Sequence, residues 1–222
     1  FLMRDALGNA IDTTDPDVFE ELQTAFTIEE DDIPLDTDET NLFVTSAENL
    51  RYNVILMLDY TGSMFNAGAG NGDVIGQMVS ASTDFIDDLP PSFRLALMEY
   101  HDRQQTNRLV HNFSTSKVSL KDGLLAFDVP FGENGASEVY DALLDGIQRL
   151  ANEDIGTLPF DDTDVRALIF ISDGRDTSSI ATLEECITQA TDNRVRLYPI
   201  GFGQNVNAAP LIQLATETGG HY

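Results

Sequence analysis

The stretch VILMLDYTGSM, residues 54–64, is an apolar run that ends in an acid. Val54–Leu58 is continuous and apolar, which is the pattern of a strand covered on both faces. Asp59 follows directly, and hydroxyl side chains then occupy alternate positions at Thr61 and Ser63. In open α/β sheets, ligands bind beyond the carboxyl ends of the strands, so this stretch predicts both a parallel sheet and a polar site at its edge.

The chain beyond Tyr52 alternates predicted strands with predicted helices. Apolar runs predict buried strands at 94–100, 167–171 and 195–202, and an alternating run predicts an edge strand at 108–113. Apolar residues at helical spacing predict helices over 74–89 and 139–150, capping residues Thr182 and Asn207 begin two more, and Gly219 ends the last. This order predicts an α/β fold: a doubly wound, mostly parallel sheet with helices on both faces.

The first 48 residues differ from the rest. They are acidic, and the alternating runs at 25–35 and 41–45 predict short strands with one solvated face. We therefore expect an N-terminal extension over residues 1–48 and the α/β domain over residues 49–222. The acidic stretches Asp12–Asp17 and Asp36–Thr40 read as solvated turns, with calcium binding as the less favoured interpretation.

Composition excludes several classes of partner. The 222 residues include 38 acidic and 12 basic side chains, for a net charge of −26, which disfavours nucleic acid and anionic membranes. No apolar run reaches the roughly 18 residues that a membrane span needs, so membrane insertion is not expected. The single cysteine, Cys186, excludes an intrachain disulfide and leaves the cellular compartment open. We expect the chain, which begins at Phe1, to be a segment of a larger multidomain protein.

A second strand also ends in an acid. Residues 167–172 run into Asp173-Gly174, and two parallel central strands would bring Asp59 and Asp173 to one edge of the sheet. Ser137 stands just before the predicted helix at 139–150, where it either caps that helix or points into the cleft. Two carboxylates with hydroxyls and no histidine or cysteine favour one hard divalent cation, Mg²⁺ before Ca²⁺ or Mn²⁺, over zinc or copper.

Several ordered motifs resemble those of the von Willebrand factor A domains. DYTGSM is similar to their Asp-x-Ser-x-Ser motif, GASEVYDAL to Gly-Gly-Thr-x-x-Tyr-Asp-Ala-Leu, and FISDGRD to the strand ending in Ser-Asp-Gly. The resemblance covers residues 52–222 and implies a Rossmann-like domain with a metal-ion-dependent adhesion site, although the family's last strand and helix are not found. The metal ligands that it implies are Asp59, Thr61, Ser63, Ser137 and Asp173. Thr61 replaces a serine and Ser137 a threonine, and both keep the hydroxyl.

The resemblance implies a binding module and not an enzyme. The bound cation would coordinate an acidic group of a protein or other ligand. The acidity, and a similarity of FTIEEDDIPLD to a strand that precedes this domain in some bacterial surface proteins, favour an extracellular or cell-surface setting in a bacterium. The alternative setting is cytoplasmic, as for the A domains that are attached to ATP-driven machines.

An enzymatic alternative comes from the same stretch. DYTGS also resembles the DKTGT of haloacid-dehalogenase-like phosphotransferases, in which Asp59 would be the nucleophile. Tyr60 stands where those enzymes have lysine, and Thr61 where the soluble ones have an acid. The only lysines are Lys117 and Lys121, and neither follows a predicted buried strand.

Overall fold

The structure is a computed structural model that describes residues 29–30, 33–34, 51–62, 64, 74–101, 108–125, 137–152, 164–202 and 206–222. The chain divides into two compact units, Phe1–Leu50 and Arg51–Tyr222. In the first unit, the described residues form one antiparallel pair, β1 (Glu29–Glu30) with β2 (Ile33–Pro34). The acidic stretches at 12–17 and 36–40 and the predicted strand at 41–45 lie outside the described residues.

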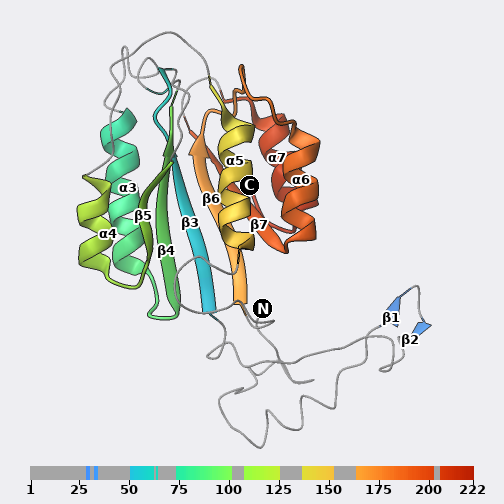
Figure 1. Ribbon diagram of the computed structural model, residues 1–222, viewed down its shortest axis with the longest axis horizontal. Helices are drawn as coiled ribbons and strands as arrows, with labels where there is room; N and C mark the ends of the chain where they lie inside the picture. Colours follow the sequence, from blue (N-terminus) through green and yellow to red (C-terminus); the bar gives the residue numbers. More distant parts are fainter. Residues whose placement is uncertain are drawn as a thin grey trace, which may run out of the picture. The chain divides into compact units, whose positions relative to one another are not determined.

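The second unit is built on a five-stranded sheet whose central strand contains the quoted apolar run (Figure 1). This strand is β3 (Arg51–Asp59), with β4 (Phe93–Tyr100) and β6 (Asp164–Ser172) parallel on either side. β7 (Val195–Gly201) continues the parallel sheet, and β5 (Leu109–Ser114) adds an antiparallel edge strand. The mostly parallel sheet and its antiparallel edge strand confirm the predicted fold class.

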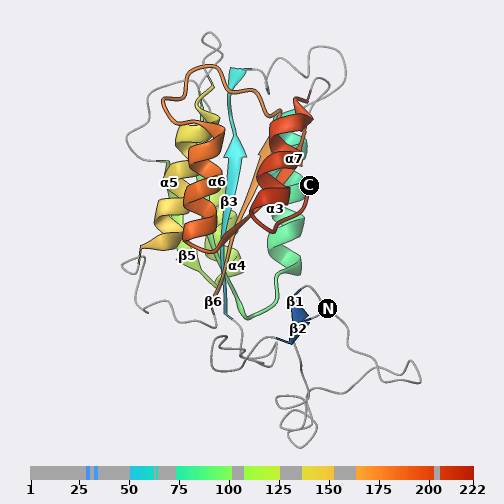
Figure 2. The same ribbon diagram turned by 90° about the vertical axis from the view of Figure 1, so that its right-hand side faces the viewer.

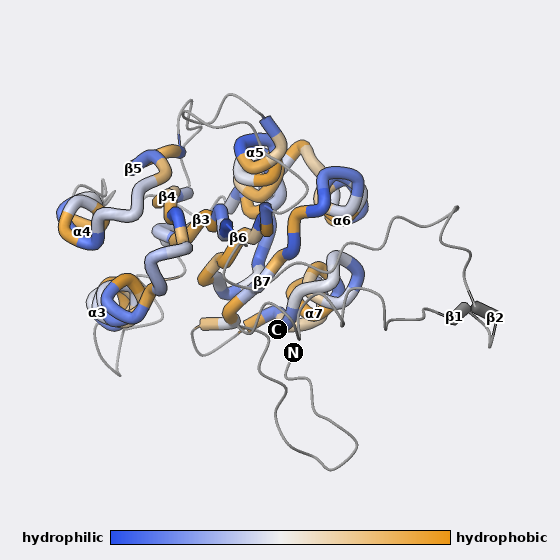
Figure 3. Tube along the Cα trace, turned by 90° about the horizontal axis from the view of Figure 1, so that it is seen from below, coloured by the Kyte–Doolittle hydropathy of each residue, from blue (hydrophilic) through white to orange (hydrophobic). Residues whose placement is uncertain are grey.

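The described helices cover both faces of the sheet. They are α3 (Val74–Asp88), α4 (Lys117–Leu124), α5 (Val139–Ala151), α6 (Leu183–Asp192) and α7 (Ala208–Glu217). Viewed along the strands, α5 and α6 lie on one side of the sheet, with α3 and α4 on the other (Figure 3). Seen from the side, α5 and α6 again lie opposite α3 (Figure 2). None of the helices in the described part of the chain is long and apolar enough to cross a membrane.

Local sequence signals account for several helix ends. Pro90 and Pro91 follow α3, and Gly219, with a φ of 71°, follows α7. Both capping-box bonds of α6 are present: the Thr182 hydroxyl accepts the Glu185 amide, and the Glu185 carboxylate accepts the Thr182 amide. Helix α4 was not predicted, because only Leu120, Gly123 and Leu124 of its residues are buried and its apolar pattern is weak.

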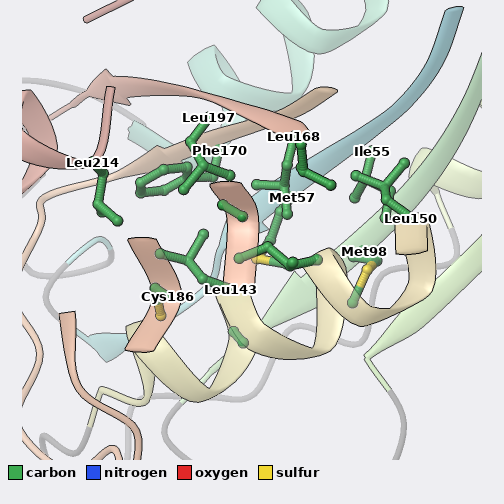
Figure 4. Close-up of a cluster of buried hydrophobic side chains, with 14 of the residues drawn as sticks. Ile55, Met57, Met98, Leu143, Leu150, Leu168, Phe170, Cys186, Leu197 and Leu214 are labelled. Carbon is green, nitrogen blue, oxygen red and sulfur yellow. The ribbon is translucent and has the colours of Figure 1, made fainter. Parts of the chain in front are cut away.

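The core consists of one apolar cluster on each face of the sheet. Alternate residues of β3 serve the two clusters, which explains why the strand is apolar without interruption. Ile55 and Met57 belong to the cluster that includes residues of α5, α6 and α7 (Figure 4), whereas Leu56 belongs to the cluster that includes residues of α3 and α4. The packing on both faces holds the end of β3, and therefore Asp59, in a defined position.

The one cysteine belongs to this core and is predicted to be unreactive. Burial, helped by the nearby carboxylates of Asp141, Glu185 and Asp176, raises the pKa of the Cys186 thiol to about 12. At pH 8 roughly one thiol in ten thousand would then be ionised. We expect a disulfide reagent such as DTNB to react with the native chain far more slowly than with the chain in denaturant. Equal rates in the two conditions would contradict the burial.

Candidate metal centre

The parallel register brings the two acids to the same edge of the sheet, the upper edge in Figure 1. Leu58 of β3 lies opposite Ile171 of β6, so Asp59 and the end of β6 at Ser172 leave the sheet side by side. On the other side of β3, Asp59 lies opposite Tyr100 of β4. Asp59, Tyr100 and Ser172 thus meet where three strands end.

The Asp59 carboxylate is fully buried and accepts four hydrogen bonds. Its Oδ1 accepts from the backbone amide and the hydroxyl of Thr61, at 2.8 and 2.5 Å. Its Oδ2 accepts from the hydroxyls of Tyr100 and Ser172, at 2.7 and 2.9 Å. A carboxylate has about four lone-pair sites, so the acceptor capacity of Asp59 is filled by the protein.

Burial nevertheless leaves this charge insufficiently compensated. It raises the pKa of Asp59 above the ordinary aspartate value, and the bonds from Thr61, Tyr100 and Ser172 offset that rise only in part. Burial also raises the pKa of the Tyr100 phenol, and the charges of Asp59 and Asp173 add to the rise. Two carboxylates therefore act on one buried phenol, and a cation at this edge would relieve the cost of burying the Asp59 charge.

Asp173 follows directly on β6 and is held through its backbone. Its side chain is only 7% exposed, and Oδ1 accepts the Arg175 amide at 3.0 Å. Its carbonyl accepts the amide of Asn207 at 2.8 Å, which ties it to the start of α7. Gly174 has a φ of 74°, which non-glycine residues rarely adopt, and so allows the sharp turn after the acid.

Ser137 has a buried polar atom that lacks a partner among the described residues. The residue is 6% exposed, and its Oγ makes no hydrogen bond with the described residues. It does not cap α5, because the N-cap position belongs to Glu138, whose side chain makes no capping bond. Of the two roles open from the sequence, the capping role is therefore wrong. A buried hydroxyl without a partner suits a ligand position for a hard cation.

The backbone of Ser137 is bonded to the loop that follows Asp173. Its amide donates to the Thr177 hydroxyl at 2.8 Å, and its carbonyl accepts the amides of Thr177 and Ser178 at 3.0 and 3.1 Å. Further along, the Asp141 carboxylate of α5 accepts the amides of Ile180 and Ala181. The loop after the second acid and the start of α5 thus form one hydrogen-bonded unit.

We expect Thr177→Val to weaken metal binding about tenfold, because the Ser137 amide would lose its acceptor and the hydroxyl beside it would lose its fixed position. Titration calorimetry with Mn²⁺ would measure the affinity. Thr177→Ser keeps the acceptor and serves as the matched control, with nearly unchanged binding. Equal affinities of the valine and serine variants would show that this bond does not position Ser137.

Four of the five expected ligands lie in the described part of the chain, and Ser63 lies outside it. Within the described residues there is no group of three or more histidine, cysteine, aspartate or glutamate side chains that could hold a metal ion. The predicted ligand set, in which hydroxyl oxygens join the two carboxylates, stays a prediction. Sequence reasoning missed Tyr100, Ser172 and Thr177 as partners of the site, although Ser172 directly precedes the predicted ligand Asp173.

These features define a doubly wound α/β domain with an oxygen-lined site at the carboxyl edge of its central strands. The model of the von Willebrand factor type A domain family matches residues 53–222. The chain therefore belongs to this family, as its motifs predicted.

Known proteins of similar sequence and fold agree with this assignment. The chain is 26% identical over 181 residues to the inter-alpha-trypsin inhibitor heavy chain H4 of Bos taurus; the match covers 79% of this chain but only 18% of that protein. Among solved structures, proximal thread matrix protein 1 of the mussel byssus, with a zinc-occupied MIDAS motif, has a TM-score of 0.62 at 16% identity, over 75% of this chain and 42% of that one. The manganese-loaded TRAP protein of Plasmodium vivax has a TM-score of 0.54 at 18% identity, over 76% and 63%.

Proposed function

We propose that the domain is a divalent-cation-dependent binding module whose metal site is formed by Asp59, Thr61, Ser63, Ser137 and Asp173. The observation that carries the proposal is the buried Oγ of Ser137, which has no hydrogen-bond partner among the described residues, on a residue whose backbone is bonded to the loop that follows Asp173. When bound, the cation would supply an open coordination position for a carboxylate of the partner.

The hydrogen bonds of Asp59 support a division of roles among these residues. Thr61 donates its one hydroxyl proton to Asp59, so toward a cation its hydroxyl oxygen could act only as a lone-pair donor. Asp59 itself supplies negative charge and holds Thr61, Tyr100 and Ser172 in place. In this arrangement Asp59 orients other groups, and its carboxylate has no unused acceptor position.

The ion that we propose is Mg²⁺, from the hard oxygen donors of the described ligands. Manganese and zinc also belong in the test, because similarly folded proteins are manganese-loaded and have a zinc-occupied MIDAS motif.

The geometry favours binding over phosphoryl transfer. A nucleophilic Asp59 would need a free carboxylate oxygen, but both of its oxygens are occupied by hydroxyl and amide donors. It would also need a lysine near the phosphate. Lys117 and Lys121 instead bond Asp87 at the far end of α3, away from the carboxyl edge.

The proposed partner is a protein or other ligand that presents a carboxylate, and the proposed context is a larger, extracellular protein. A relative in which the matched domain covers 18% of the length supports the view of a module. The net charge of −26 would repel an acidic partner at long range, and physiological salt screens this repulsion beyond about 8 Å. The cation contact itself acts at short range.

Selection from a displayed random-peptide library tests this function. The full chain would be immobilised in Mg²⁺ buffer, and the bound peptides eluted with EDTA. We expect every enriched sequence to contain Asp or Glu, and replacement of that residue by Asn or Gln to weaken binding at least about tenfold. Enrichment of sequences without an acid, or retention of peptides in EDTA, would contradict the proposal.

A further inference from the structure

The loop that joins β6 to α6, residues 173–182, lies at the carboxyl edge of the sheet beside the start of α5 (Figures 1 and 2). It begins with Asp173 of the proposed metal site and exposes two side chains of different chemistry. One is Arg175, an exposed cation in a chain with 12 basic residues against 38 acidic ones. The other is Ile180, which at 91% is the most exposed large apolar side chain in the described part of the chain.

Hydrogen bonds anchor the backbone of this loop beside the candidate metal centre. The Arg175 amide donates to the Asp173 carboxylate at 3.0 Å, so the arginine side chain begins directly next to the second acid. The Ile180 amide donates to the carboxylate of Asp141 at 3.1 Å. Asp141 lies in the first turn of α5, which begins two residues after Ser137. Both exposed side chains therefore start from backbone that is held close to a residue of the proposed metal site.

The acids nearest to Arg175 in the loop have other partners. Asp176 turns toward α5, where its Oδ1 accepts the Ser179 hydroxyl at 2.5 Å and the Tyr140 amide at 3.4 Å. The Asp173 carboxylate accepts the Arg175 backbone amide and belongs to the proposed metal site. No ion pair links the Arg175 guanidinium to another of the described residues. Its charge can therefore pair with an acid that a partner brings.

We propose that this loop selects a partner segment with two acids and a large apolar residue: one acid binds the cation, the second pairs with Arg175, and the apolar side chain packs on Ile180. The proposal rests on the proposed function of the metal site. A guanidinium fork matches a carboxylate, and it gives local attraction where the net charge of −26 repels an acidic partner.

The anchored backbone is what distinguishes Ile180 from an ordinary surface residue. Single exposed apolar side chains are common and need no explanation by themselves. Here, however, the amides of Ile180 and Ala181 are both bonded to Asp141, at 3.1 and 2.9 Å. A partner that packs on this side chain has little loop backbone left to order, so most of the gain from burying it is kept as affinity.

A displayed peptide library with one fixed central aspartate and random flanking residues tests the proposal. The full chain would be immobilised in Mg²⁺ buffer, and the bound peptides eluted with EDTA. We expect the flanks to become enriched in a second Asp or Glu and in large apolar residues. Retention that needs the fixed aspartate but leaves the flanks random would overturn this proposal and leave the metal function standing. Retention that survives replacement of the fixed aspartate by asparagine would overturn both.

Two variants assign the preferences to their residues. Arg175→Gln should remove the enrichment of the second acid and weaken binding of a selected peptide about threefold, as expected for an exposed ion pair. Ile180→Ser should remove the apolar enrichment and weaken binding about tenfold. Arg196→Gln, at an exposed side chain near the amino end of β7, and Val118→Ser, at a 70% exposed one on α4, are the matched controls and should keep both preferences.

Metal affinity shows whether the two variants act on the partner. Titration calorimetry with Mn²⁺ should give the same affinity for the parent, Arg175→Gln and Ile180→Ser, because neither side chain belongs to the proposed metal site. A loss of Mn²⁺ affinity as large as the loss of peptide affinity would mean that the variants damage the metal site, and would overturn the proposal. Equal losses of peptide affinity in Arg175→Gln and Arg196→Gln would mean a response to net charge and would overturn the role of Arg175.

Discussion

Asp59→Asn should abolish the uptake of Mg²⁺ and Mn²⁺ while the domain stays folded. Asparagine has the same shape, and its carbonyl oxygen can still accept from Thr61 while its amide donates toward Tyr100 and Ser172, whose hydroxyl oxygens can accept. The lost charge should lower metal affinity by more than about 100-fold. Titration calorimetry measures this loss directly.

Stability measurements on Asp59→Asn, with and without metal, separate the loss of metal binding from any damage to the fold. Because burial raises the pKa of Asp59, ionisation of this group costs the metal-free domain stability as pH rises above the ordinary aspartate value. In EDTA at neutral pH, the asparagine variant should therefore be at least as stable as the parent. Metal at 100 times its dissociation constant should stabilise only the parent, by about 2.7 kcal/mol.

Ser172→Ala is the matched control for this prediction. It removes one hydrogen bond to the same carboxylate and keeps the charge, so it should retain metal binding with a modest loss of affinity. Unchanged metal uptake in Asp59→Asn would refute the assignment of Asp59. An equal loss of metal affinity in the two variants would mean that metal binding depends on the hydrogen bonds of Asp59 and not on its charge.

Gly174→Ala should damage both stability and the metal site. At a φ of 74° a side chain is strained by about 1–3 kcal/mol. A Cβ at this position would also lie 2.6 Å from the carbonyl oxygen of Asn207, which is backbone and cannot move aside cheaply. Because Asp173 precedes this glycine, relief of the clash should displace the second acid and weaken metal binding at least about tenfold.

Gly219→Ala separates the strain of a positive φ from the clash with the Asn207 carbonyl. Its φ of 71° is nearly the same, but a Cβ there meets nothing within 4 Å. Urea denaturation would measure the loss of unfolding free energy in both variants. The loss in Gly219→Ala gives the cost of the backbone conformation alone. The extra loss in Gly174→Ala gives the cost of the clash. If the two variants lose equal stability and Gly174→Ala binds metal normally, the contact with Asn207 does not position Asp173.

The fold was predictable where one sequence signal determined one element. The uninterrupted apolar run of β3 marked a central strand, Pro90 and Pro91 marked the end of α3, and Thr182 with Glu185 marked the start of α6. Helix α4 gave no such signal, since it covers the edge of the sheet with only three buried residues. Its lysines bond Asp87 of α3, and a contact between separate helices leaves no local pattern.

The candidate ligands were predictable because their motifs are contiguous, but the groups that hold them were not. Tyr100 and Ser172 reach Asp59 only through the register of three strands, with separations of 41 and 113 residues. Thr177 supports Ser137 across 40 residues. The residues that hold a site in place depend on which strand ends and loops become neighbours, and a single sequence does not show this.

The four donors around Asp59 also bear on how fast the site can load. Those bonds form as the sheet forms, so the ordering of this side chain is complete before any ion arrives. The Asp59 side chain therefore needs little rearrangement when the ion binds. We expect the slow step to be the loss of hydration water from the ion, which Mg²⁺ gives up reluctantly. Association kinetics at this edge would then reflect the chemistry of the ion more than the mobility of Asp59.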